Sequence, residues 1–251
     1  MRRLSANLFR FFPIVALALA GCATTGTTTG NVDPDTGVDQ LESMNRTLFA
    51  IHKPYDRYLL RPVATGYQMI VPGPFRRAIT NFFLNFRSPV YIVNDLLQGK
   101  PKHALQSTSR MVINSTLGLG GIWDPAEMSA GLPKRQEDFG QTLAVWGVNS
   151  GPYSFIPFLG PSTTRDGIGI LIDALTMGPI LAISDSSLRW KALGLFYINT
   201  RADLLPLDEM LETAADPYVF LREAFLQRRN YVIHDGDPPE EDFEDFGDED
   251  D

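Results

Sequence analysis

The sequence predicts an all-α protein made of many short helices. Prolines recur where the first turn of a helix tolerates them, capping residues precede apolar runs, and strand-like alternation is scarce. No repeat of fixed period is visible. The prolines that fit a first turn are Pro54, Pro62, Pro74, Pro89, Pro101 and Pro217. Two of them follow good capping residues, in Ser88-Pro89 and Asp216-Pro217, so helices are expected to begin there.

The first 21 residues have the pattern of a secretory signal. Arg2 and Arg3 precede an apolar run that extends from Phe11 to Ala20 and is broken by Pro13. The run is shorter than the roughly 20 apolar residues of a membrane-spanning helix. Residues 1–21 are therefore expected to be removed from the mature protein.

Cys22 is the only cysteine among the 251 residues. A buried thiol, a nucleophile and an attachment point are the three roles open to it. Leu19, Ala20 and Gly21 before it resemble the lipobox of bacterial lipoproteins, in which the thiol takes a diacylglycerol and the chain is cut before the cysteine. No histidine lies nearby in the sequence to activate the thiol, so lipid attachment is favoured. Ala23 stands where Asp would favour retention in the inner membrane, which predicts the outer membrane.

Composition divides the mature chain into a tether, a body and a tail. Residues 22–38 are mostly Thr, Gly and Asp, which is typical of a flexible tether. The body, residues 39–234, has balanced charge and no dominant basic run, so nucleic acid is not an expected partner. Residues 235–251 contain eleven Asp and Glu and no Lys or Arg, which predicts an acidic, disordered tail.

The first and last helices of the body have the clearest start signals. The stretch from Asp39 to Glu42 has the spacing of a capping box before an apolar run, so a helix is expected to begin there. The last helix is expected to follow Asp216 and to stop near Gly236. Its apolar face consists of Tyr218, Leu221, Phe225 and Val232.

Two further segments are unusually apolar for a soluble protein. Residues 151–161 form an aromatic stretch whose three prolines argue against regular structure. Residues 167–183 are almost wholly apolar but are interrupted by Asp173 and by the pair Gly178-Pro179. Two short apolar arms around this turn fit either a re-entrant membrane hairpin or a buried core hairpin. In the membrane hairpin, Asp173 should face protein or water rather than lipid.

The sequence offers no credible active site. The three histidines are far apart and have no metal-ligand spacing, and neither a Gly-x-Ser-x-Gly elbow nor a phosphate-binding Gly-Lys-Ser/Thr loop is present. Residues 118–121 are glycine-rich, but they follow an apolar helix and are predicted to be a helix end. Arg165 and Asp166 are more simply a salt bridge or a helix cap than a catalytic pair. We therefore expect no enzyme activity, no cofactor and no metal.

Several segments, in order along most of residues 39–236, resemble the MlaA (VacJ) family of outer-membrane lipoproteins. The matching stretches are "ESMNRTLFAIHKPYDRYLLRP" (42–62), "VPGPFRRAITNFFLNFRSP" (71–89), "NDLLQG" (94–99), "NSTLGLGGIWDPA" (114–126), "EDFGQTLAVWGVNSGPYSFIPFLGPSTTRDGIG" (137–169) and "DPYVFLREAFLQRR" (216–229). The stretch "FAIHKP" departs from the more aromatic, Asn-containing sequence typical of the family, and the acidic tail is particular to this chain.

The resemblance implies both an architecture and a function. Members of the family are ring-shaped assemblies of helices that lie in the inner leaflet of the outer membrane, on its periplasmic side, beside trimeric porins. A central amphipathic channel is thought to pass phospholipids mislocalised in the outer leaflet to a periplasmic lipid carrier, which maintains lipid asymmetry. The expected fold is therefore an all-α ring with a re-entrant apolar helical hairpin. No chemistry is required, in keeping with the missing active site.

The ring implies three sets of candidate residues. An apolar rim at bilayer depth would use Phe82, Phe83, Phe86, Phe155, Phe158, Leu171 and Ile172. A polar bore that admits a charged head group would use Arg165, Asp166, Asp173, Arg189 and Lys191, although a salt bridge or a cap explains each of these equally well. Asn45 and Arg46 either line the ring or lock the first helix to a neighbour, and the lock is favoured slightly.

Two other functions are compatible with the sequence. A lipoprotein that braces porins and moves no lipid would also need an anchor and an apolar surface. A phospholipase that degrades stray lipids is a weaker possibility because it needs catalytic residues.

Overall fold

The computed structural model describes residues 39–176 and 178–239. All of them belong to the second of the two units into which the chain divides, Met1–Gly37 and Val38–Asp251. The expected signal segment 1–21, the attachment residue Cys22, the tether 22–38 and residues 240–251 of the acidic tail lie outside the described residues.

The described unit is mainly helical, which confirms the predicted all-α class. A small two-stranded hairpin accompanies the helices. The elements are α3 (Glu42–Tyr55), the π-helical turn η2 (Asp56–Leu60), α4 (Arg61–Ile70), α5 (Gly73–Leu97), α6 (Pro101–Thr116), α7 (Pro125–Met128), α8 (Phe139–Val145), β1 (Tyr153–Ile156), β2 (Gly160–Thr163), α9 (Thr164–Thr176), α10 (Ser186–Leu204), the 3-10 turn η3 (Leu205–Leu207), α11 (Asp208–Thr213) and α12 (Pro217–Ile233).

Four of the six prolines lie in the first turn of a helix, as predicted. Pro62, Pro74, Pro101 and Pro217 occupy the first or second helical position of α4, α5, α6 and α12. The missing N–H of proline costs nothing there, because the first N–H groups of a helix have no intrahelical partner. The Asp216 side chain caps α12 by accepting hydrogen bonds from the backbone N–H groups of Tyr218 and Val219, also as predicted.

The predictions for Pro54 and Pro89 are wrong, because both prolines lie inside helices. Pro54 is the next-to-last residue of α3, and the π-helical turn η2 begins two residues later, at Asp56. Pro89 lies within α5, between the buried residues Ser88 and Val90. Packing on both sides of this helix therefore outweighs the roughly 3 kcal/mol that an interior proline costs.

The first helix begins at Glu42, but the expected capping box is absent. No side chain caps the helix from Leu41. Instead, Asp39 accepts a hydrogen bond from the backbone N–H of Leu41 at 3.0 Å and another from the Tyr218 hydroxyl of α12. Asp39 therefore joins the two ends of the described unit instead of closing the first turn of α3.

The main apolar core lies where α3, β1 and α12 meet. Its buried members are Phe49, Tyr153, Phe155 and Tyr218. Phe49 packs edge-on against Phe155, with 5.4 Å between ring centroids, and its ring lies 5.9 Å from that of Tyr218. The core thus ties the first helix, the hairpin and the last helix together.

Residues 151–161, predicted to be irregular, contain most of the β-hairpin. Strand β1 pairs antiparallel with β2, and Phe155 lies opposite Pro161. A two-stranded sheet leaves one edge of each strand unpaired, so a proline is tolerated where its missing N–H is not needed for the ladder. Pro157 falls in the connection between the strands. Two of the three prolines therefore lie at positions that a hairpin accommodates.

The predicted helical hairpin of residues 167–183 is half correct. Its first arm is helical and forms most of α9, whereas residues 179–182 form turns instead of a second helix. Pro179 cannot donate a backbone hydrogen bond, and α10 is already capped by Asp185, so the second arm is too short for a helix of its own. Ile180 is buried, so part of this arm packs against protein.

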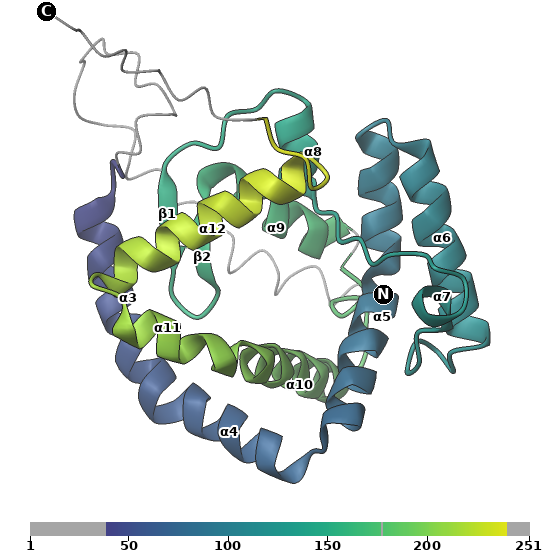
Figure 1. Cartoon of the computed structure of the whole chain (residues 1–251), viewed down its shortest axis with the longest axis horizontal. Coiled ribbons are helices and arrows are strands. Elements are labelled where there is room, and N and C mark those ends of the chain that lie inside the picture. The colour runs from purple at the N-terminus through teal and green to yellow at the C-terminus, as the bar shows by residue number, and fades with distance from the viewer. Residues whose placement is uncertain (1–38, 177, 240–251) are drawn as a thin grey trace, which may run out of the picture. The chain divides into compact units, whose positions relative to one another are not determined.

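The contacts between elements form a closed circuit (Figure 1). From α3 the circuit passes through η2 to α4, then to α10, α5, α8, α9, β2 and β1, which contacts α3 again. Helix α12 connects β2, α8 and α11, whereas α6 packs on α5 and α7 packs on α6. Such closure by side-to-side contact is what a ring of short helices requires.

Among residues 39–176 and 178–239, no helix is both long enough and apolar enough to span a bilayer.

Candidate functional site

Large apolar side chains are exposed over much of the described unit, and they outnumber the buried ones. Met69 and Ile70 at the end of α4 are both 81% exposed, and Trp190 of α10 is 69% exposed. Others gather at the end of α6 and at α7, where they include Leu117, Leu119, Ile122, Trp123 and Met128. Exposed apolar surface on this scale marks contact with lipid or with another protein.

The seven predicted rim residues divide into three groups. Phe82, Phe158 and Leu171 are exposed, as a rim requires. Phe86 and Ile172 are partly buried, and the Phe86 ring stacks on that of Phe82 with 5.8 Å between centroids. Phe83 and Phe155 are buried in the protein.

Phe83 and Phe155 are therefore corrections to the predicted rim. Phe83 packs edge-on against Phe196 of α10, with 5.2 Å between ring centroids. Phe155 points inward because alternate residues of a strand face the same side, and its neighbour on that side, Tyr153, is also in the core. Neither side chain is placed to contact lipid.

Arg165 and Asp166 lie in a buried ionic network that joins α8, α9 and α12. The Arg229 guanidinium of α12 donates two hydrogen bonds of 2.6 Å to the Asp138 carboxylate and one of 2.8 Å to Asp166. Arg165 Nε contacts the same Asp166 oxygen at 3.2 Å, and its Nη1 donates to the carbonyl of Val148. The network thus fixes three elements that are remote in sequence.

Asp138 has two roles in this network. Its carboxylate accepts a 2.9 Å hydrogen bond from the backbone N–H of Gln141 and so caps α8, while it also binds Arg229. Burial opposes the Asp138 charge, but the hydrogen bonds from Arg229 and Gln141 outweigh that effect and lower the pKa of the carboxyl group. Asp138 is therefore held as an anion by its partners.

Asp173 joins α9 to α5 and α8. Its carboxylate accepts a 2.8 Å hydrogen bond from the backbone N–H of Phe139 and a 3.1 Å hydrogen bond from Asn94. Burial raises the pKa of this carboxyl group, although both hydrogen bonds favour the anion. The acidic residue in the apolar arm therefore faces protein, as the interpretation of this arm as part of a membrane hairpin predicted.

The predicted bore residues differ in their access to solvent. Arg165, Asp166 and Asp173 are buried and bound to protein groups, so they do not line an open passage in this structure. This is a correction to their predicted place, because a bore-lining group must be reachable by water or lipid. Arg189 is half-buried, and Lys191 is exposed. The structure therefore leaves these two cations of α10 as candidates for the bore.

Asn45 and Arg46 make the contacts that a helix lock requires. Asn45 is fully buried, and its amide donates to the carbonyl of Tyr153 at 2.9 Å and accepts from the N–H of Phe155 at 2.9 Å. Arg46 donates to Asp216, the cap of α12, at 2.7 Å. Its guanidinium also lies 4.6 Å from the centre of the Tyr218 ring. The first helix is thereby bound to both β1 and α12.

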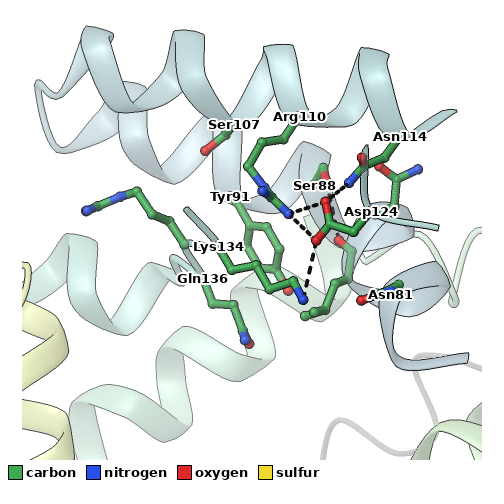
Figure 2. Close-up of a pocket in the computed structure, with 12 residues that line it drawn as sticks. Asn81, Ser88, Tyr91, Ser107, Arg110, Asn114, Asp124, Lys134 and Gln136 are labelled. Atoms are coloured by element: carbon green, nitrogen blue, oxygen red, sulfur yellow. Dashed lines mark hydrogen bonds and ion pairs between the residues drawn. The ribbon is translucent and has the colours of Figure 1, made fainter. Parts of the chain in front are cut away.

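An ionic cluster around Asp124, which the sequence patterns did not predict, joins α6 to α7 (Figure 2). The Asp124 carboxylate accepts hydrogen bonds of 2.8 Å from Arg110 and 2.8 Å from Asn114, and Lys134 lies at 3.3 Å. Asp124 also caps α7 through the N–H of Glu127. The sequence pair Asp124-Pro125 has the same form as Asp216-Pro217 and could have predicted that Asp124 caps a helix. It could not have predicted the ionic partners of Asp124.

The pocket beside this cluster is too small for a lipid. Its volume of about 30 Å³ has room for roughly one or two water molecules. The buried Tyr91 hydroxyl lines it and has no hydrogen-bond partner among the described residues, which fits an ordered water. The pocket is therefore part of the scaffold and not a route for lipid.

Asp124 makes the unit sensitive to acid. Burial opposes its charge, but hydrogen bonds from Asn114 and Arg110 outweigh that effect and lower its pKa from 3.8 to about 2. Because the folded-state pKa lies below the unfolded-state value, this stabilisation is present above pH 4 and is lost as the pH falls toward 2. The shift corresponds to about 2 kcal/mol.

We therefore expect Asp124→Asn to lower the free energy of unfolding by about 2 kcal/mol near pH 6. The difference from wild type should shrink as the pH falls from 4 toward 2, because the wild-type carboxyl group then becomes protonated in the folded state too. Urea unfolding at several pH values measures this difference, and Glu209→Gln on the exposed surface of α11 is the control. A difference that is constant with pH would contradict the assignment.

A second polar cluster that sequence patterns did not predict lies between α5 and α8. Asn94 accepts a 2.7 Å hydrogen bond from the Thr142 hydroxyl, and Gln98 donates to Glu137 at 3.0 Å. Burial raises the pKa of Glu137, although Gln98 and nearby cations favour its charge. These side chains are separated by about 40 residues in sequence, so no local pattern indicates their contact.

Within the part of the chain that the structure describes, no group of His, Cys, Asp and Glu side chains is arranged to hold a metal ion. The glycine-rich residues 118–121 form the turn that follows α6, as predicted, and Gly120 and Gly121 both have positive φ angles.

Comparison with known proteins reveals extensive sequence similarity. The family model described as MlaA lipoprotein matches residues 37–232. The "Intermembrane phospholipid transport system lipoprotein MlaA" of Shigella flexneri is 37% identical over 225 residues, which are 87% of this chain and 86% of that protein. The protein of the same description from Escherichia coli (strain K12) is 36% identical with the same coverage.

The fold is similar to a solved structure as well. A chain from work described as "Structural basis for maintenance of bacterial outer membrane lipid asymmetry" superposes with a TM-score of 0.69 at 36% identity. The match covers 78% of this chain and 99% of that chain.

Proposed function

Because this chain belongs to the MlaA lipoprotein family, we propose that it removes mislocalised phospholipids from the outer leaflet of the outer membrane. The observation that carries the proposal is the family match over residues 37–232. The relatives are named for intermembrane phospholipid transport, and the similar solved structure concerns outer-membrane lipid asymmetry. The role of this chain is then to maintain that asymmetry without chemical change to the lipid.

In this proposal, phospholipid passes through a bore enclosed by the circuit of helices. Support comes from the closed set of contacts that runs through α4, α10, α5 and α9, and from the exposed apolar side chains on those helices. Apolar side chains can contact the hydrocarbon of the bilayer without a cost in free energy. A charged lipid head group does incur such a cost, so it must move along polar groups of the protein. Arg189 and Lys191 are the predicted bore residues that remain accessible to such a head group.

The rim and the interior residues have separate roles in this account. Phe82, Phe158 and Leu171 provide exposed apolar surface for the bilayer. Arg165, Asp166 and Asp173 act as positioning residues that fix α9 against α5, α8 and α12. The helices of the circuit can then contact lipid on the outside while these buried contacts hold them in place.

The location follows from the leader sequence. We propose that Cys22 carries the lipid that holds the chain on the periplasmic side of the outer membrane. A trimeric porin would hold the helical unit at bilayer depth, and a periplasmic lipid carrier would receive the phospholipid. The chain carries no energy-coupling motif, so such partners would set the direction of net transport.

Deletion of the gene tests the proposed function. The amount of phospholipid exposed on the cell surface should rise in the deletion strain and return to normal when the wild-type gene is restored. Cells with Cys22→Ser should resemble the deletion, because the chain would lose its attachment. An unchanged surface in cells with an intact outer membrane would contradict the proposal.

The two competing functions predict different results. A lipoprotein that only braces porins would co-purify with a porin, and its loss would leave surface phospholipid unchanged. A phospholipase would release free fatty acid when the purified protein is incubated with labelled phospholipid. We expect no such release, because sequence patterns indicate no catalytic constellation.

A further inference from the structure

Arg87 lies on α5, at the outer limit of cation–π distance from two aromatic rings. Its guanidinium carbon is 5.8 Å from the centre of the Tyr91 ring, one turn further along α5, and 6.0 Å from that of Phe196 on α10. The side chain is half-buried. Stacking on aromatic faces uses the plane of the guanidinium and leaves its five N–H donors at the edge for other partners.

None of these donors has an acceptor among the residues that the structure describes. Within the described ranges, no carboxylate oxygen lies within 4.0 Å of the Arg87 guanidinium, and no hydrogen bond from it is formed. The arginines of the neighbouring networks differ, because Arg110, Arg165, Arg201 and Arg229 each bind at least one carboxylate.

An acid whose charge interacts with that of Arg87 is already engaged by other groups. Asp173 feels the positive charge of Arg87, but its two carboxylate oxygens accept hydrogen bonds from the N–H of Phe139 and from Asn94. A guanidinium that has lost part of its water and has no counter-ion is unfavourable. The position is therefore suited to an anion that comes from outside the chain.

The surroundings limit the chemistry of that anion. Helices α5 and α10 are adjacent in the circuit of contacts, Phe83 lies one turn before Arg87 on α5, and Phe86 directly precedes Arg87. A ligand here meets a planar cation next to aromatic surface. Arginine suits phosphate, because the edge of the guanidinium can donate two parallel hydrogen bonds.

We propose that Arg87 binds the phosphate group of a phospholipid where α5 meets α10 in the wall of the bore. This inference rests on the proposed function and names a residue of the bore that the sequence patterns did not indicate. Arg87 is then a ligand-binding residue, whereas Asp173 behind it is a positioning residue.

Equilibrium binding to the purified full chain in detergent tests this inference. The probes are a short-chain phosphatidylglycerol, a diacylglycerol with the same tails but no phosphate, and inorganic phosphate. Arg87→Gln should weaken phosphatidylglycerol binding about tenfold, which is typical of a lost hydrogen bond to a charged group. Binding of the diacylglycerol should be unchanged.

Matched variants separate this effect from a change in folding. Arg77→Gln, on an exposed position of the same helix, should bind phosphatidylglycerol as the wild type does. Arg87→Met keeps the apolar stem that packs on the two rings and is the variant to use if Arg87→Gln lowers the melting temperature. It should show the same loss of phosphatidylglycerol binding.

The possible outcomes distinguish this inference from the proposed function. If the folded Arg87 variants bind phosphatidylglycerol as tightly as the wild type, the role of Arg87 is overturned while the transport function stands. If the wild type binds no phospholipid at all, both are overturned. If inorganic phosphate binds at Arg87 and phosphatidylglycerol does not displace it, the site takes a free anion and the lipid assignment is wrong.

Discussion

Replacing Arg229 by methionine is expected to lower the free energy of unfolding by about 3–5 kcal/mol. The change leaves Asp138 without its ion pair and takes from Asp166 the shorter of its two arginine contacts. The Asp166 side chain is only 5% exposed, so water cannot replace the lost partner. For a domain of this size the melting temperature should fall by about 10 °C, which thermal unfolding in detergent would measure.

Arg228→Met is the control for this experiment. Arg228 is the exposed neighbour of Arg229 on α12, so its replacement should leave the melting temperature unchanged. Adding Asp166→Asn to Arg229→Met should recover part of the lost stability, because one of the two buried charges that lost Arg229 is then removed. Equal effects of Arg228→Met and Arg229→Met would contradict the structural role of the network.

Asp173→Leu is expected to destabilise the protein by about 3 kcal/mol, because two buried donors then lose their acceptor. These donors are the N–H of Phe139 and the amide of Asn94. Asp173→Asn keeps one acceptor oxygen and should cost about 1 kcal/mol. Thermal unfolding of both variants in detergent gives the order of stability.

The same pair of variants separates a positioning role of Asp173 from a role of its charge in transport. Cells with Asp173→Asn should keep the outer leaflet nearly free of phospholipid, because the protein remains folded. Cells with Asp173→Leu should lose the function in proportion to the loss of folded protein. Failure of a stable, correctly located Asp173→Asn variant would instead show that the carboxylate itself acts on the lipid.

The helices could be predicted from the sequence because their signals are local. Pro62, Pro101 and the pair Asp216-Pro217 mark helix starts through the missing N–H of proline and the capping carboxylate. The exceptions, Pro54 and Pro89, are positions where neighbouring structure outweighs the local preference. Local rules thus identify most helix starts but not every one.

The tertiary contacts could not be predicted from such rules. Asp138 and Arg229 are 91 residues apart, and Asn94 and Asp173 are 79 apart, so no periodic pattern connects them. Residues 153–156 form a strand, which was not predicted because three prolines lie around them. A hairpin tolerates proline in its turn and along its free edges. Which positions these are is known only once the strand pairing is known.

The structure changes the roles assigned to the candidate residues. Polar residues in and near the apolar arm look like bore residues in the sequence, yet Arg165, Asp166 and Asp173 are bound to protein. Buried charges of this kind need partners, and here the partners come from helices on either side. The circuit of helices is therefore fixed by buried ionic contacts, while many of its large apolar side chains are exposed.

In the proposed function, phospholipid passes through a bore in this chain. Sealed vesicles with a fluorescent phospholipid in the inner leaflet only, and with the lipidated protein and a trimeric porin in the outer leaflet, test it most directly. The label should become extractable by a soluble phospholipid carrier faster than in vesicles that contain the porin alone. Equal extraction with and without the chain, in vesicles that stay sealed, would contradict the account and favour a porin brace.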